Sequence, residues 1–195
     1  MNYRLSLNYL DQSGVVQGTE LRRASTAISY QDRFLDRFDI SASLKGSRQD
    51  DAFTPGSVIG DATALPPVNP IFNDDGSFYQ SPNNLDPGNP IATLASVQDR
   101  GTTYRSVGHL ETRYDFPFLT GLSGTLNLGY DYASSRHTVF TPRGLRGGTG
   151  SFSRWDPSGL NKLLDLYGTY TRSFDQFASQ VNLTGGYSYE DSRVE

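Results

Sequence analysis

The sequence has 195 residues and contains no cysteine, one methionine, one tryptophan and two histidines. Without cysteine the chain forms neither disulfide bonds nor thiolate metal sites. The two histidines, His109 and His137, lack the close spacing of paired metal ligands. We therefore interpret His109 as a strand residue on a polar face and His137 as a loop residue. No metal and no cofactor is expected.

The sequence also lacks clusters of like charge and long apolar runs. The 17 Lys and Arg residues are scattered among 21 Asp and Glu, so no basic stripe is present that would neutralise phosphates, and nucleic acid is excluded as a partner. No apolar run approaches the roughly 18 to 20 residues of a membrane-spanning helix. The mean hydropathy of -0.52 alone would favour a soluble protein, but the strands of a membrane barrel are only half apolar.

The residues that are abundant favour β structure, because the chain has 12 Tyr, 11 Phe and 20 Gly. Polar and apolar positions alternate in several segments, as they do in strands with two different faces. We expect about seven strands, each near the ~9 to 11 residues that cross a bilayer at a tilt. They are predicted at residues 2–9, 21–30, 38–46, 104–116, 122–132, 163–172 and 181–189.

The segment 122–132 shows the alternation most clearly. Leu126, Leu128 and Tyr130 alternate with Asn127 and Asp131, so the first three share one face and the last two the other. Leu183 and Asn182 repeat this contrast in the last predicted strand. If the chain belongs to a membrane barrel, we expect the apolar set to point to lipid and the polar set to point inward.

The connections between these strands alternate between short and long. Short connections are expected at 31–37, 117–121 and 173–177, whereas those at 11–20, 47–102 and 133–161 are longer. The last two far exceed the few residues usual in a compact domain. Outer-membrane barrels have this asymmetry, with tight periplasmic turns and long extracellular loops.

Aromatic residues gather near the ends of the predicted strands, where aromatic girdles of a barrel would meet the lipid headgroups. A general preference of Tyr for strands is the alternative explanation. The residues concerned are Tyr9, Tyr30, Phe38, Tyr104, Phe116, Tyr132, Tyr170 and Tyr189.

Motifs of enzymes are missing. There is no Gly-x-Ser-x-Gly elbow, and the glycine-rich stretch 144–150 lacks the Gly-Lys-Ser/Thr of a phosphate-binding loop. Residues 73–76, Asn-Asp-Asp-Gly, lack the spaced ligands of a calcium loop. Because they lie between Phe72 and Phe78, we interpret them as a hairpin turn. The chain is not expected to be an enzyme.

One constellation in the long connection 133–161 could bind a ligand. It consists of Arg143, Arg146, Arg154 and Trp155. Guanidinium groups recognise carboxylates and phosphates, and a Trp face stacks on a sugar or a cation. A solvated loop with incidental charge is the alternative interpretation.

The succession of segments resembles the barrel of SusC/RagA-type TonB-dependent transporters. The resemblance lies in LSLNYLDQSGVVQGTELRRASTAISYQDRFLDRFDISASLKGSRQ, NPIFNDDGSFYQ, GNPIATL, YDFPFLTGLSGTLNLGYDY and TYTRSFDQFASQVNLTGGYSYE, which together cover nearly the whole chain. It implies that residues 1–195 supply part of an antiparallel transmembrane β-barrel of about 22 strands, closed around a plug. The chain shows no plug domain, no secretory signal and no terminal aromatic residue, so we expect it to be an internal piece.

The resemblance also implies function and partners. The whole protein would import glycans, oligosaccharides or peptides across the cell outer membrane, energised by the TonB system through its plug. Its partners would be the remaining barrel strands, outer-membrane lipid and a SusD-like lipoprotein. The residues alone leave open a soluble or secreted β-sandwich for binding or adhesion, whose apolar faces would meet across a core.

Overall fold

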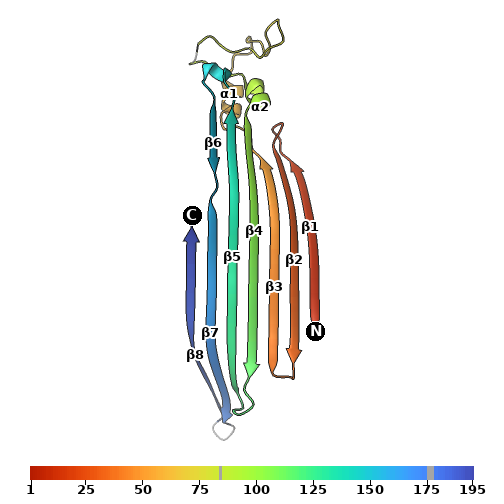
Figure 1. The fold of residues 1–195 in the computed structure, drawn as a ribbon, viewed down its shortest axis with the longest axis vertical. Coiled ribbons are helices and arrows are strands. Elements are labelled where there is room, and N and C mark those ends of the chain that lie inside the picture. The colour runs from red at the N-terminus through yellow and green to blue at the C-terminus, as the bar shows by residue number, and fades with distance from the viewer. Residues whose placement is uncertain (84, 175–177) are drawn as a thin grey trace.

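The computed structural model describes residues 1–83, 85–174 and 178–195, apart from the side chain of Arg146. The strands in this part of the chain form a single antiparallel sheet in which neighbours largely follow chain order (Figure 1). The meander comprises β1 (Asn2–Ser13), β2 (Glu20–Phe34), β3 (Phe38–Ala52), β4 (Gln98–Asp115), β5 (Leu122–Thr141), β7 (Ser158–Phe174) and β8 (Ser179–Val194). Each of the seven predicted strands is thereby found, and one further strand, β6 (Ser151–Trp155), pairs with β5.

Several strands are longer than the alternation predicted. β4 begins at Gln98 instead of residue 104, and β5 continues to Thr141 instead of residue 132. The added residues include Thr103 and Ser135, which are register partners. Because polar residues occupy both faces there, the sequence no longer alternates between apolar and polar residues, although the strands remain hydrogen-bonded. The two long connections therefore span 53–97 and 142–157 between the main strands.

The register aligns residues of the same kind across all seven strands of the meander. One row of partners consists of Tyr3, Tyr30, Ala42, Leu110, Leu128, Leu164 and Tyr189. The adjacent row consists of Asn2, Gln31, Ser41, Glu111, Asn127, Asp165 and Ser188. Because successive residues of a strand point to opposite sides, the sheet has one apolar face and one polar face.

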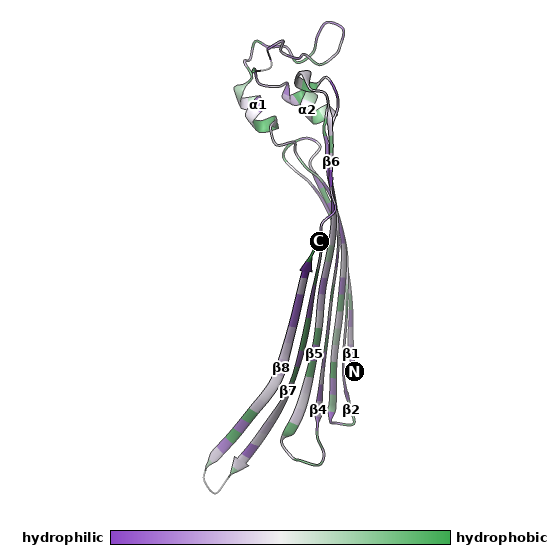
Figure 2. Ribbon diagram, turned by 60° about the vertical axis from the view of Figure 1, so that its left-hand side comes forward, coloured by the Kyte–Doolittle hydropathy of each residue, from purple (hydrophilic) through white to green (hydrophobic). Residues whose placement is uncertain are grey.

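No second layer covers the apolar face in the described part of the chain. The only buried hydrophobic residues there are Val58 and Ala92, which lie in helices away from the sheet. On the apolar face Leu7 is 77% exposed and Leu183 is 61% exposed, whereas Thr125 on the polar face is only 6% exposed. Figure 2 shows the sheet as one long, bent layer with the helices beyond one end. The structure therefore gives no support to a β-sandwich.

A row of aromatic rings crosses the apolar face at the end with the short turns. Adjacent ring centroids lie 5.1 to 6.4 Å apart along the series Phe34, Phe38, Tyr114, Phe116 and Phe118. The rings come from β2, β3 and β4 and from the turn that follows β4. Aromatic side chains thus form a row over β2, β3 and β4 at this end of the sheet, and Phe38 and Phe116 in this row belong to the residues predicted for the girdles.

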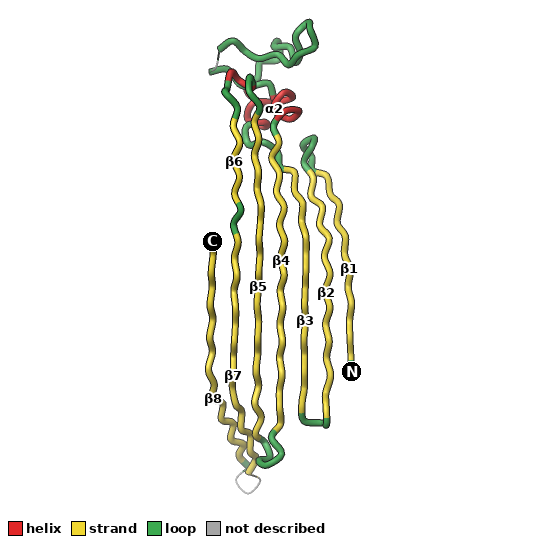
Figure 3. Tube along the Cα trace, viewed as in Figure 1, coloured by secondary structure: helices red, strands yellow, loops and turns green. Residues whose placement is uncertain are grey.

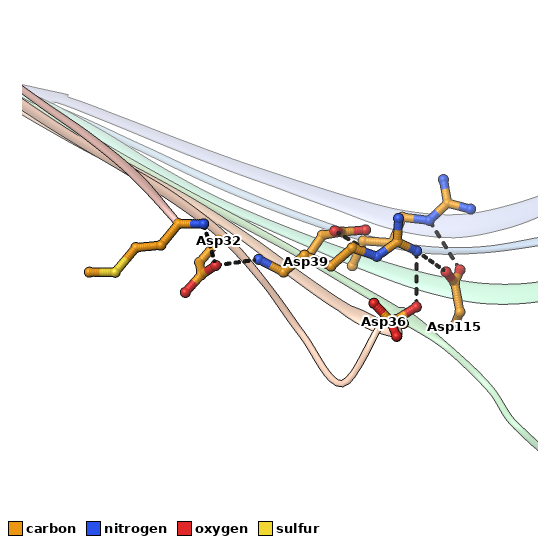
Figure 4. A network of polar contacts seen from close by, with 7 residues as sticks. Asp32, Asp36, Asp39 and Asp115 are labelled. Atoms are coloured by element: carbon orange, nitrogen blue, oxygen red, sulfur yellow. Dashed lines mark hydrogen bonds and ion pairs between the residues drawn. The ribbon is translucent and has the colours of Figure 1, made fainter.

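Ion pairs join the strands at the same end (Figure 4). Arg33 in β2 lies 3.5 Å from Asp39 in β3 and 3.5 Å from Asp115 in β4. It also donates a hydrogen bond to the carbonyl of Asp36 in the turn, at 3.0 Å. Arg113 reaches Asp115 at 3.2 Å. One guanidinium group therefore links three strands and a turn on the polar side of the sheet.

The long connection 53–97 contains two helices that the sequence did not predict. It contains α1 (Val58–Ala64) and α2 (Pro90–Ser96), coloured red in Figure 3. The side chain of Asn89 caps α2 by accepting hydrogen bonds from the amides of Ile91 and Ala92, and Pro90 occupies the first turn. Asn followed by Pro is a known start signal for a helix, so this element could have been found from the sequence.

The hairpin predicted at residues 73–76 is confirmed. Phe72 and Phe78 form an antiparallel bridge, and their rings stack with centroids 5.2 Å apart. Gly76 has a φ of +81°, and the amide of Asn73 donates to the carbonyl of Ser77 at 2.8 Å. The side chain of Asn89 donates to the carbonyls of Ile71 and Tyr79, which attaches this hairpin to the start of α2.

Candidate functional site

The structure separates the residues proposed as a binding constellation. Arg154 and Trp155 are consecutive in β6, so their side chains point to opposite sides of the sheet. Arg143 lies in the loop after β5, and its side chain is exposed. Arg146 lies in the short 3-10 turn Leu145–Gly147, and its side chain is outside the described residues. Arg154 and Trp155 therefore belong to two different groups of side chains.

Arg154 belongs to an ion-pair cluster with Asp156 and Arg136. Its Nε lies 2.6 Å from one carboxylate oxygen of Asp156, and the Nε of Arg136 lies 2.9 Å from the other. Hydrogen bonds from Arg154 and then from Arg136 lower the pKa of Asp156 below its usual value. Because the side chains are 46 to 61% exposed, the cluster is solvated and contributes little to stability. The cluster connects Asp156, between β6 and β7, with Arg136 in β5 and Arg154 in β6.

Trp155 belongs to a row of three rings with His137 and Phe53. Trp155 is the register partner of His137 in β5. The centroid of the His137 ring lies 5.3 Å from the Trp155 ring and 5.2 Å from the Phe53 ring. The Nε2 of His137 lies 2.5 Å from Oδ1 of Asp99 in β4, which is a hydrogen-bonding distance. We call Phe53, His137, Trp155 and Asp99 the ring strip.

The ring strip lies on the polar face of the sheet. His137 in β5 is the register partner of Gly101 in β4. Each lies an even number of residues from a residue of the polar row, Asn127 in β5 and Glu111 in β4, so both point to the polar face. The ring of Phe53 crosses the position that a side chain of Gly101 would occupy, since an added Cβ would lie 2.9 Å from its Cε2. Gly101 therefore leaves the space in which the Phe53 ring reaches His137.

Polar groups surround the strip on the same face. The amide nitrogen of Gln49 lies 3.1 and 3.0 Å from the two carboxylate oxygens of Asp51, the register partner of Gly101. Thr103 and Ser135, one pair further along, share a hydrogen bond of 2.9 Å between their hydroxyls. The rings are thus bordered by carboxylates, an amide and hydroxyls.

The sequence pattern indicated Trp155 as a candidate binding residue but not the residues that contact its ring. His137 was interpreted as a loop residue, and this was wrong because β5 extends through it to Thr141. His109 lies on the polar face of β4, as predicted. Phe53 and Asp99 lie within the stretch assigned to a long loop, so nothing in their spacing indicated a contact with residue 137. Had the alternation of strand 122–132 been continued to residue 137, it would have placed this histidine on the polar face.

Residues 1–83, 85–174 and 178–195 contain neither a candidate metal site nor a candidate membrane-spanning helix. No group of three or more His, Asp or Glu side chains is placed to hold a metal ion within these ranges. No helix in the described part of the chain is long and apolar enough to span a membrane.

Curated proteins with similar sequences are TonB-dependent receptors. The TonB-dependent receptor SusC of Bacteroides thetaiotaomicron is 27% identical over 161 residues, which are 70% of this chain and 16% of the relative. The TonB-dependent receptor P3 of Formosa agariphila is 28% identical over 210 aligned positions, covering 99% of this chain and 20% of the relative. The chain thus spans at most a fifth of the length of these relatives. No family model matches it.

Solved structures share the fold. The RagAB peptide importer in the 'closed-closed' state superimposes with a TM-score of 0.72 at 13% identity, covering 97% of this chain and 22% of the matched chain. The RagAB peptide transporter gives a TM-score of 0.73 at 16% identity, with 98% and 23% covered. The predicted fold, an antiparallel segment of a larger β-barrel, is confirmed by this likeness and by the open sheet.

Proposed function

We infer that this chain is part of the barrel wall of a SusC/RagA-type TonB-dependent transporter, which imports nutrients across the outer membrane. Its sequence is similar to that of TonB-dependent receptors, and its fold matches that of a peptide importer. These relatives are named as receptors and transporters, so we propose a role in transport without catalysis. Within that protein the chain contributes seven neighbouring strands of the wall, β6 and two long loops.

The main support for this proposal is that apolar and polar side chains lie on opposite faces of the sheet. An apolar face with side chains such as Leu7 and Leu183 exposed in the isolated chain requires a partner. Removing one Leu side chain from water is worth roughly 1.5 to 3 kcal/mol, and the face holds apolar residues on every strand of the meander. Lipid supplies that environment without a second protein layer, and the polar face then lines the interior or contacts a plug.

The two ends of the sheet differ in a way that favours one orientation. The turns at 35–37 and 116–121 are short, whereas the connections at 53–97 and 142–157 carry helices and an additional strand. We propose that the short turns face the periplasm and the long loops face the exterior. The aromatic row from Phe34 to Phe118 then lies at the periplasmic headgroup level.

The substrate and the partners are further parts of the proposal. The matched solved structures are named as a peptide importer and a peptide transporter, and we propose that the whole protein takes up oligosaccharides or peptides. We further propose a plug within the same protein, coupling to the TonB system through that plug, and a SusD-like lipoprotein over the extracellular loops. Residues 53–97 and 142–157 are the segments of this chain that would meet such a lipoprotein.

Fractionation and uptake assays on the full-length protein test this function. We expect the protein in the outer-membrane fraction, and we expect deletion of its gene to abolish growth on its oligosaccharide or peptide substrate. Loss of TonB should have the same effect in cells that still contain the protein. Recovery of the full-length protein in the soluble fraction would contradict the proposal.

A further inference from the structure

The ring strip has no role in the proposed contacts of the barrel wall with lipid. The rings of the apolar face would make these contacts, but Phe53, His137 and Trp155 lie on the opposite face. Trp155 is 52% exposed and Phe53 is 43% exposed, so these rings are not packed into a core. Aromatic rings beside a few polar groups are typical of the lining of ligand-binding sites.

We propose that the ring strip is a binding site for a neutral oligosaccharide in the interior mouth of the transporter. This inference rests on the proposed function, because it places the polar face inside a barrel. Aromatic faces pack against the apolar C–H faces of sugar rings, and carboxylates accept hydrogen bonds from sugar hydroxyls. The strip offers three adjacent rings and the carboxylate of Asp99.

The arrangement of the rings suits a chain of sugars better than a single flat ligand. The His137 ring is tilted by 56° to the Phe53 ring and by 46° to the Trp155 ring. The three rings are therefore not coplanar, and they occupy adjacent positions over β4, β5 and β6. Asp99 orients the His137 ring in the middle of the strip through the bond to Nε2.

The charges near the strip favour a neutral ligand over an acidic one. Asp51 and Asp99 lie on the same face as the rings and repel uronates and phosphates. The cations of β6 and β5 next to the rings, Arg154 and Arg136, are directed to the other face, where both bind Asp156. Further along the polar face, Arg105 is paired with Asp131 and Arg23 is the register partner of Gln49. The Gln49 amide and the Thr103 and Ser135 hydroxyls add neutral hydrogen-bonding groups beside the strip.

Binding to the purified full-length transporter in detergent tests the site. The probes are neutral gluco-, manno- and xylo-oligosaccharides of six units, an oligogalacturonate of the same length and a set of hexapeptides. We expect at least one neutral oligosaccharide to bind, and Trp155→Ala to weaken that binding roughly three- to tenfold, the size of one aromatic contact. Phe53→Ala should act in the same direction.

Phe152→Ala is the matched control. Phe152 lies in the same strand, is 66% exposed and has the opposite parity to Trp155, so its removal should leave oligosaccharide binding unchanged. Gly101→Ala should weaken binding through displacement of the Phe53 ring, without removing any ring. Equal binding by the wild type and Trp155→Ala, or binding only of the galacturonate, of peptides or of no probe, overturns the proposal. The transport function fails separately, if the protein is absent from the outer membrane.

Discussion

At the scale of single residues, the two faces of the sheet differ in what each side chain must contact. Leu128 and Asn127 are neighbours in β5. The register partners of Leu128 are Leu110 and Leu164, whereas those of Asn127 are Glu111 and Asp165. The same substitution at these two positions therefore tests two different environments in one strand.

A substitution to Arg at these two positions should have unequal effects on barrel assembly. A charge on the lipid face near the middle of the bilayer costs on the order of 2 to 4 kcal/mol, whereas one on the interior face costs little. We expect Leu128→Arg to reduce the folded yield of the full-length protein in lipid vesicles far more than Asn127→Arg. Heat-modifiable migration on gels measures this yield, and similar yields would count against the assignment of the faces.

At the scale of elements, the turns at the short-loop end hold the register of the hairpins. Gly121, which precedes β5, has a φ of +90°. Its backbone also contacts β7, because the carbonyl of Gly121 accepts a hydrogen bond of 2.9 Å from the amide of Thr171. A side chain added at Gly121 would meet the carbonyl oxygen of Thr171. Both the backbone conformation and the close approach require glycine here.

Gly121→Ala should therefore destabilise the β4–β5 hairpin and its contact with β7. We expect a loss of about 1 kcal/mol or more, because alanine is strained at this φ and the backbone of Thr171 must move. Gly129→Ala is the control, since an added Cβ there lies 3.5 Å from the Cβ of Leu163, an ordinary contact. Urea-dependent unfolding in vesicles measures both variants, and equal midpoints would contradict the role of Gly121.

The sequence predicted elements well where the two faces contrast. Strand 122–132 was placed correctly because Leu126 and Leu128 alternate with Asn127. Strand ends were missed where Thr102 and Thr103, or Ser134 and Ser135, put polar groups on both faces. The ring strip could not be predicted, because Phe53 meets His137 through the pairing of β3, β4 and β5, which the local pattern does not encode.

At the scale of the whole molecule, the sheet is open. β1 and β8 are the outer strands of the meander, and each has an unpaired side in the described structure (Figure 1). An open edge presents free backbone N–H and C=O groups to any other chain. The apolar face is uncovered as well. In the proposed barrel, further strands would pair with these edges and lipid would cover this face.

Residues 1–195 expressed alone should therefore aggregate in detergent-free buffer. Lipid alone should not rescue them, because each unpaired backbone group in a bilayer costs several kcal/mol. Sedimentation and circular dichroism measure the outcome. A monodisperse β protein that melts cooperatively would show that the apolar faces pack together, as in the β-sandwich alternative.

The central claim is that the apolar face contacts lipid and the polar face does not. Spin labels on single cysteines in the full-length protein test it most directly, at Leu126, Leu128, Tyr130 and Leu183 on one face and at Asn127, Asp131 and Asn182 on the other. Oxygen, which partitions into lipid, should relax the first set strongly and the second set weakly, whereas a water-soluble nickel complex should do the reverse wherever the interior is open to water. Equal relaxation of the two sets by oxygen would contradict the account.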